Sequence, residues 1–296
     1  MSDVYPPIQK PYKRNGEILK DGVFPEGMHR VALGIEYNGG QFHGFQKQLS
    51  GVDTVQARLE LALSKVANEE VSLVCAGRTD AGVHGTNQVV HFDTLASRPM
   101  KAWTRGVNTA LPDSISVKWA QAVTPQFHAR FSAQHRTYRY VIANTYTRPA
   151  LAYEQLTWVR ETLDLDAMKA GAAQLVGEHD FSSFRAAQCQ AKNPVRRIHY
   201  LHIVRRADLI VVEIQANAFL HHMVRNILGV LLAVAKGDKP AQWVSEVLAA
   251  KDRSSASVTA KPNGLHLVGV AYPEVFSLPV SSPGPIFVHE PLGELC

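Results

Sequence analysis

Alternating apolar residues, interrupted by stretches with helical spacing, constrain the fold of this 296-residue chain most strongly. Four apolar side chains alternate along residues 30–37 and are followed by an Asn-Gly-Gly turn signal, a pattern typical of a half-buried strand. They are Val31, Leu33, Ile35 and Tyr37. After a cap at Asp53 or Thr54, the apolar residues of 55–68 lie three or four positions apart, which predicts an amphipathic helix.

This succession of strands and helices continues and then recurs. Three further strands are expected at 71–76, 87–94 and 114–122, with a helix at 101–110. After a link near 125–136, the pattern predicts strands at 135–143, 198–206, 209–218 and 265–272, and helices at 166–176, 219–237 and 241–251. Strands interspersed with helices, with apolar residues on two sides, indicate sheets that are covered by helices.

The fold class expected from this pattern is α+β, with two α/β halves. Each half is predicted to be a mainly antiparallel sheet covered by helices, so that the protein has two sheet layers. The expected divisions are a flexible lead-in at 1–28, an N-terminal half at 29–125, a C-terminal half at 126–273 and a surface tail at 274–296.

Composition narrows the class of protein without defining its function. Hydrophobic residues make up 46% of the chain, which excludes wholesale disorder, and the net charge of +5 is compatible with nucleic acid without requiring it. The three cysteines, Cys75, Cys189 and Cys296, form neither a disulfide framework nor a CxxC zinc motif. With no membrane-spanning run and no secretory signal, the expected location is cytoplasmic.

One segment is rich in glycine and carries charged side chains, unlike the strands and helices around it: Cys75-Ala-Gly-Arg-Thr-Asp-Ala-Gly-Val-His-Gly85. It directly follows an expected strand, where loops commonly present functional side chains. Three glycines leave little bulk around Asp80, so a ligand could approach its carboxylate closely. Arg78 lies two residues away and would share a face with Asp80 in extended backbone. From the residues alone, a solvated glycine-rich turn is an equal alternative, and the segment matches no phosphate-binding loop.

Together with GIEYNGGQFHGFQ upstream, this segment resembles the signature of the TruA family of tRNA pseudouridine synthases. Further similar motifs follow in order: FHARFSAQHRTYRY (127–140), GEHDFSSFR (177–185), NAFLHHMVRNILG (217–229) and GLHLVGV (264–270). The resemblance extends from about Arg30 to Tyr272. It implies a pseudouridine synthase fold with the active site in a cleft between the halves. It also implies isomerisation of uridine at positions 38, 39 and 40 of the tRNA anticodon stem-loop, no cofactor, no required metal, and a homodimer.

The resemblance also assigns roles to four residues. It makes Asp80 the catalytic carboxylate and Arg225 its partner, places Tyr138 against the target base, and has Arg78 help to hold the RNA open. Physically, a guanidinium can bind a carboxylate through two parallel hydrogen bonds and favours its ionised form. The spacing of His221, Arg225 and Gly229 predicts that they lie along one stripe of a helix, with Gly229 leaving room beside the guanidinium.

Several weaker signals favour structural roles. Adjacent histidines diverge by about 100° on a helix, so His221 and His222 are expected in packing or RNA contact and no metal-ligand cluster is expected. Asp180 is expected in a turn or cap, Phe45 in packing, and Phe127 and Phe131 in the core. A basic set, some of whose members are expected to meet phosphates, comprises Arg130, Arg136, Arg139, Arg148, Arg185, Lys192, Arg196 and Arg197.

Two other functions compete with the synthase. A tRNA-binding chaperone without catalysis is the first, and the presence of Asp80, Tyr138 and Arg225 together argues against it. A phosphate-ester hydrolase is the second, and it is disfavoured because the sequence shows neither a metal-ligand cluster nor a nucleophile–base pair.

Overall fold

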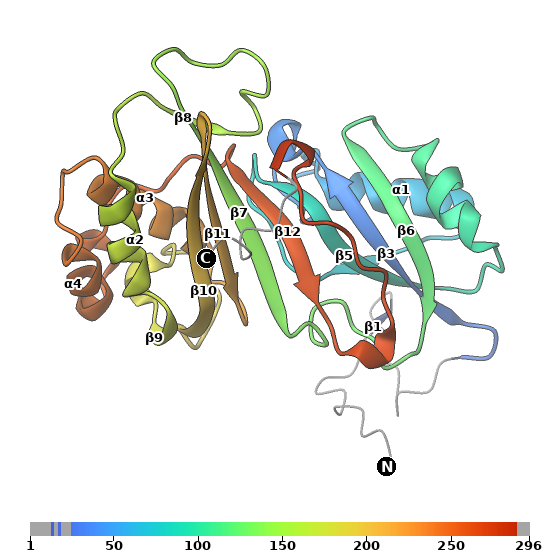
Figure 1. Ribbon diagram of the computed structural model, residues 1–296. Helices are drawn as coiled ribbons and strands as arrows, with labels where there is room; N and C mark the ends of the chain where they lie inside the picture. Colours follow the sequence, from blue (N-terminus) through green and yellow to red (C-terminus); the bar gives the residue numbers. More distant parts are fainter. Residues whose placement is uncertain (1–12, 15–16, 19–24, 289–296) are drawn as a thin grey trace.

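We describe the protein from a computed structural model, which covers residues 13–14, 17–18 and 25–288 (Figure 1). Two short strands, β1 (Lys13–Arg14) and β2 (Glu17–Ile18), pair with each other in antiparallel fashion. The expected flexible lead-in at 1–28 otherwise falls largely outside the described residues. The last eight residues of the expected tail, including Cys296, lie outside them as well.

A ten-stranded, mostly antiparallel sheet forms the centre of the molecule. Its main path runs β6-β3-β5-β12-β7-β11-β10-β9, with β4 pairing to β5 and β8 pairing to β7. The strands, in chain order, are β3 (His29–Tyr37), β4 (Leu73–Cys75), β5 (His84–Thr94), β6 (Ile115–Val123), β7 (His135–Asn144), β8 (Thr157–Val159), β9 (Gly177–Asp180), β10 (Val195–Arg206), β11 (Leu209–Ala216) and β12 (Leu265–Ala271).

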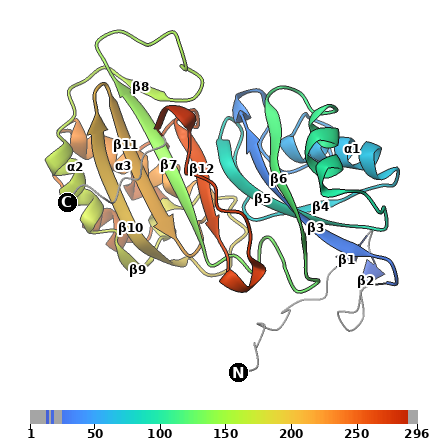
Figure 2. The same cartoon turned by 45° about the vertical axis from the view of Figure 1, so that its right-hand side comes forward.

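The sheet is continuous, so the prediction of two separate sheet layers was wrong. Strand β12 returns from the C-terminal part of the chain and inserts between the two groups of strands (Figure 2). It pairs antiparallel with β7 and parallel with β5, where His266 and Leu267 face His84 and Gly85. This pairing joins residues about 180 positions apart in the chain, a long-range contact that no local periodicity encodes.

The helices cover one face of this sheet, and each half buries its own apolar cluster beneath them (Figures 1 and 2). In the N-terminal half, the alternating residues of β3 pack on α1. In the C-terminal half, even-numbered residues of β7 pack under the other helices. The helices are α1 (Val55–Ala67), α2 (Leu165–Ala173), α3 (Met223–Ala235) and α4 (Trp243–Ala250). Within the described residues, none is long and apolar enough to cross a membrane.

Two helical predictions gain detail from the structure. The side chain of Thr54 accepts a hydrogen bond from the backbone N–H of Ala57, so Thr54 is the cap of α1. The helix expected at 101–110 contains a π-helical turn at Ala102–Gly106, in which Trp103 is fully buried. Such a turn inserts an extra residue, which the spacing of apolar residues does not reveal.

The described part of the tail, 274–288, packs on the sheet face opposite to the helices. Phe276 joins a cluster with Ala32 and Phe127, and Val288 joins a cluster with Val141 in the other half. The tail therefore lies across both halves of the sheet on its helix-free face.

A buried histidine pair lies where β5 meets β12. The rings of His84 and His266 stack with centroids 4.8 Å apart. Nδ1 of His84 accepts the backbone N–H of Gly39, so its Nε2 carries the proton that it donates to the carbonyl of Glu154. Nε2 of His266 donates to the carbonyl of Gln155. Burial lowers the pKa of both histidines, that of His266 to about 3, so both are neutral at neutral pH.

We expect this pair to make the fold less stable in mild acid. The unfolded chain takes up protons near pH 6.5 that the folded protein does not bind. The contribution of the neutral pair to the free energy of unfolding is therefore fully present above that pH and is lost as pH falls. In His266→Gln, urea unfolding followed by circular dichroism should show a shallower fall between pH 7 and 5, by up to about 1.4 kcal/mol per pH unit. The exposed control His43→Gln should keep the wild-type slope; equal slopes for all three proteins would contradict the expectation.

Candidate active site

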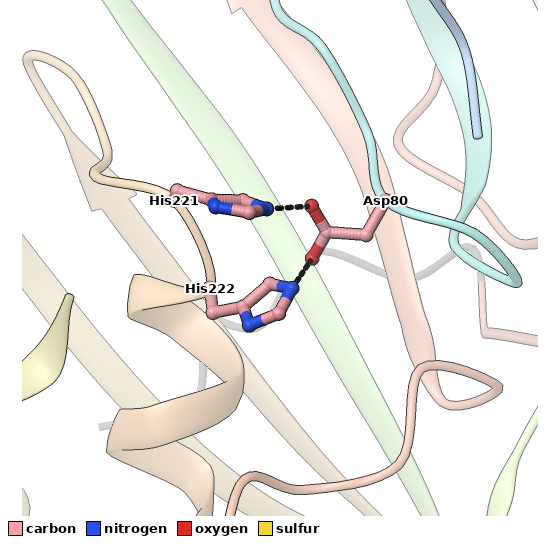
Figure 3. Close-up of side chains that lie close together, drawn as sticks. All are labelled: Asp80, His221 and His222. Carbon is pink, nitrogen blue, oxygen red and sulfur yellow. Dashed lines mark ion pairs between the residues drawn. The ribbon is translucent and has the colours of Figure 1, made fainter. Parts of the chain in front are cut away.

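An open cleft with a volume of about 1180 Å³ lies on the helix-bearing side, where the two halves meet. The loop that follows β4 lines it from the N-terminal half, and residues 218–225 line it from the C-terminal half. Asp80 projects from that loop toward the segment that leads into α3 (Figure 3). Arg78, Asp80, Tyr138 and Arg225, the four site residues named by the sequence, all line this cleft.

The backbone around Asp80 is fixed by contacts on its N-terminal side. The hydroxyl of Tyr37 lies 2.8 Å from Oγ1 of Thr79, and the backbone N–H of Phe45 donates to the Thr79 carbonyl at 3.0 Å. Gly44 has a φ of +91°, and a Cβ there would lie 3.0 Å from the same carbonyl oxygen. A residue with a side chain would therefore be strained at this position and would press on the Asp80 loop.

Arg225 reaches Asp80 from α3. Its Nη1 lies 3.2 Å from Oδ2 of Asp80, and its Nε donates to the carbonyl of Ala260 at 2.9 Å. The guanidinium thus makes one hydrogen bond to the carboxylate, where the sequence suggested two parallel ones. Gly229 does not make room beside the guanidinium, because a Cβ there would lie 2.0 Å from the carbonyl oxygen of Val258. The glycine instead lets the 258–260 segment approach α3.

His221 and His222 also contact Asp80, which the sequence did not predict. Nε2 of His221 lies 3.4 Å from Oδ1, and Nε2 of His222 lies 3.4 Å from Oδ2 (Figure 3). The helix expected at 219–237 begins only at Met223, because His222 has a φ of +61° and turns the chain before it. Both rings can therefore face one carboxylate, and the stripe predicted to include His221 does not exist. The signal available in the sequence was the histidine doublet beside Arg225.

These three side chains form a cluster of metal-ligating type, so the expectation that no such cluster exists was wrong. Asp80, His221 and His222 offer ligand atoms that all lie within 4.8 Å of one another. Two imidazoles and a carboxylate are a donor set that divalent transition metals accept. Arg225 already supplies a positive charge at Oδ2, so the protein itself balances the charge of the carboxylate. Burial lowers the pKa of His222, against the opposing effect of Asp80, and favours its neutral form.

Tyr138 forms part of the cleft lining and is largely buried. It is 7% exposed, and its ring packs edge to face against Phe219 with centroids 5.0 Å apart. Burial, and secondarily the negative charge of Asp80, raises the pKa of the Tyr138 hydroxyl far above its ordinary value. The hydroxyl therefore stays protonated at neutral pH.

Four of the basic residues fall into two groups. Arg78 and Arg130 are exposed in the cleft, whereas Arg136 and Arg139 are buried. Arg136 donates to the backbone carbonyls of Ala76, Arg130, Ala133 and Asn217. Arg139 pairs with Glu213 and donates to the tail carbonyl of Gly284. These two arginines are therefore structural, and the idea that they meet phosphates does not hold.

Of the remaining sequence predictions, some are confirmed and one is wrong. Oδ1 of Asp180 accepts the backbone N–H of Ser182, which confirms a turn role. Phe45 and Phe127 are fully buried, as expected. Phe131 is 60% exposed and lines the cleft, so its assignment to the core was wrong. Phe127, four residues earlier, lies in the preceding turn and packs inward, whereas Phe131 lies in the turn at 128–132.

Comparison with known proteins identifies the family of this chain. A family model described as tRNA pseudouridine synthase matches residues 34–132 and 172–273. The chain is 57% identical over 259 residues to tRNA pseudouridine synthase A of Shewanella piezotolerans, covering 88% of this chain and 99% of that protein. It is 54% identical over 262 residues to the Pseudomonas aeruginosa protein of the same name, covering 88% and 92%. The chain therefore belongs to the TruA family of tRNA pseudouridine synthases.

Proposed function

We propose that this protein isomerises uridine to pseudouridine at positions 38, 39 and 40 of the tRNA anticodon stem-loop, with Asp80 as the catalytic carboxylate. The observation that carries the proposal is the placement of Asp80. Its carboxylate is 22% exposed in an open cleft and is held by Arg225 from the opposite half of the protein. Membership of the family supports the same reaction.

The chemistry requires little beyond a positioned carboxylate. The C1′–N1 glycosidic bond breaks, the uracil turns, and C5 bonds to C1′. The proton at C5 is lost, N1 gains one, and no electrons are gained or lost overall. Asp80 acts in this scheme as a nucleophile or as a base at C2′. Arg225 offsets the cost of holding the carboxylate away from bulk water.

Access to a stem nucleotide requires that its base leave the helix. Unstacking and unpairing a base costs a few kcal/mol, and stacking on an aromatic side chain offsets about 1–3 kcal/mol of that cost. Tyr138 is the side chain that we assign to the target base, because it lies in the cleft with Asp80. Arg78, exposed at the same cleft, is assigned to holding the RNA open.

The proposal is tested by mapping pseudouridine in unmodified tRNA after treatment with the protein. We expect new pseudouridine at positions 38–40 and release of tritium from tRNA labelled at uridine C5. Binding of tRNA without tritium release would instead identify a tRNA chaperone. Release of phosphate that a chelator abolishes would indicate a hydrolase.

We also propose that the protein works as a homodimer, because a stem-loop is longer than one cleft and a second protomer can grip the rest of the tRNA. Analytical ultracentrifugation at the concentration of the activity assay should show a dimer. A fully active monomer would contradict this proposal.

A further inference from the structure

Phe131 combines two properties that no other large apolar residue in the described part of the chain shares. It lines the catalytic cleft, and its side chain is 60% exposed. The other large apolar side chains that are exposed in the described ranges lie outside this cleft. An exposed phenyl ring in a substrate cleft gains free energy when a ligand covers it.

The side chain of His128 packs against the ring of Phe131 and holds it in place. The two rings stack with centroids 4.3 Å apart and planes 29° apart. Nδ1 of His128 accepts the backbone N–H groups of both Arg130 and Phe131, each at 3.1 Å, so this nitrogen carries no proton. Burial, helped by the charge of Arg30, lowers the pKa of His128 to about 4. The support is thus a neutral, oriented ring at neutral pH.

The same turn is tied to the catalytic loop through one buried guanidinium. Nη2 of Arg136 donates to the carbonyl of Arg130 at 2.7 Å and to the carbonyl of Ala76 at 2.9 Å. Ala76 is the first residue of the loop that carries Asp80. Phe131 therefore keeps a fixed position relative to the catalytic carboxylate, which lowers the entropy cost of using it to bind a ligand.

We propose that Phe131 is a stacking subsite for a nucleobase adjacent to the target uridine on the same strand. The inference rests on the proposed function, since it assumes a base-flipped RNA in the cleft. When the uridine flips out, each neighbouring base loses a stacking partner, and the exposed ring of Phe131 replaces one of them.

Charge and chemistry at the site fit this ligand. The guanidinium of Arg130 lies over the Phe131 ring, 5.6 Å from its centroid, and Arg78 is exposed in the same cleft. Both cations are available for the flanking phosphates, and Arg130 turns to one of them when a base takes its place over the ring. Stacking tolerates every base, because each has a π-face. A stacking subsite therefore suits an enzyme that acts at three successive positions with different neighbours.

The test uses Phe131→Leu, which keeps apolar volume but removes the aromatic face, and Phe131→Tyr, which keeps that face. The matched control is Phe287→Leu, since Phe287 is 40% exposed and lies outside the cleft. We expect kcat/KM on tRNA to fall about 5- to 150-fold in Phe131→Leu and to stay within about threefold of wild type in the other two. Unchanged melting temperatures would show that all variants fold.

A second readout does not depend on turnover. Anticodon stem-loop RNAs carry 2-aminopurine on the 5′ or the 3′ side of the target uridine. In one of them, the fluorescence of the bound RNA should be lower with the wild type than with Phe131→Leu, because only the wild type supplies an aromatic ring that restacks the 2-aminopurine. If Phe131→Leu has the kcat/KM and the fluorescence quenching of the wild type, the stacking subsite is refuted. The proposed function still stands in that case, provided that the wild type forms pseudouridine. If the wild type forms no pseudouridine, the proposed function fails, and equal quenching in both proteins then refutes the subsite independently.

Discussion

Replacing Asp80 with asparagine is expected to abolish pseudouridine formation, with a loss in single-turnover rate of at least about 10³-fold. The substitution keeps the size of the side chain but removes the negative charge and the basic or nucleophilic oxygen. Arg225, His221 and His222 all contact Asp80, and among the described residues that line the cleft Asp80 is the only carboxylate. The measurement is pseudouridine mapping in tRNA treated with equal concentrations of variant and wild type.

The matched control for this experiment is Asp180→Asn. Asp180 is a second, partly exposed carboxylate whose oxygen accepts a backbone N–H, and it lies outside the cleft. Its variant should retain activity within about threefold. Binding of tRNA by Asp80→Asn, measured by filter retention, should survive. Turnover by Asp80→Asn equal to that of the wild type would overturn the assignment of the catalytic carboxylate.

Loss of the Arg225 guanidinium is expected to have the second largest effect. Arg225→Gln removes the positive charge 3.2 Å from Asp80 Oδ2 and leaves that partly buried carboxylate with only the two imidazoles. We expect kcat/KM to fall about 10²- to 10³-fold, as when a preorganised charge is removed from an active site. Steady-state kinetics on tRNA transcripts provide the measurement.

Arg225→Lys separates charge from geometry. Lysine keeps the charge but cannot reproduce both the contact to Asp80 and the Nε–H hydrogen bond to the Ala260 carbonyl. We therefore expect intermediate activity and a small loss of thermal stability. Arg205→Gln, which removes an exposed guanidinium bonded to Asn144, controls for the general loss of positive charge. If the activity of Arg225→Gln equals that of this control, the pairing has no catalytic consequence.

Local elements were largely predictable because their signals are local. The alternation in β3 and the Thr54 cap of α1 predicted both elements close to their actual bounds. The start of α3 was missed because the residues on both sides of His222 are apolar and typical of a helix. Their pattern does not reveal the left-handed backbone of His222, which interrupts the helix. The short strands β8 and β9 were missed because three or four residues do not establish a period.

The candidate active site was predictable only in its separate parts. The glycine-rich motif around Asp80 and the motif around Arg225 are visible in the sequence, but the two residues are 145 positions apart. Their contact depends on how the halves of the sheet join. The same holds for Phe131: two phenylalanines four residues apart both suggest core positions, and only the packing of Phe127 against Tyr272 and Phe276 shows which of the two rings turns inward.

The sequence by itself determined the strands, the helices and the family, because these depend on periodicity, capping and motifs within short windows. Tertiary structure alone decided that the two halves share one sheet, because β12 pairs with β5 across most of the chain. It alone decided that two histidines turn toward Asp80 and that Phe131 faces the cleft. These outcomes depend on packing between distant segments, whose geometry is fixed only when the whole core is formed.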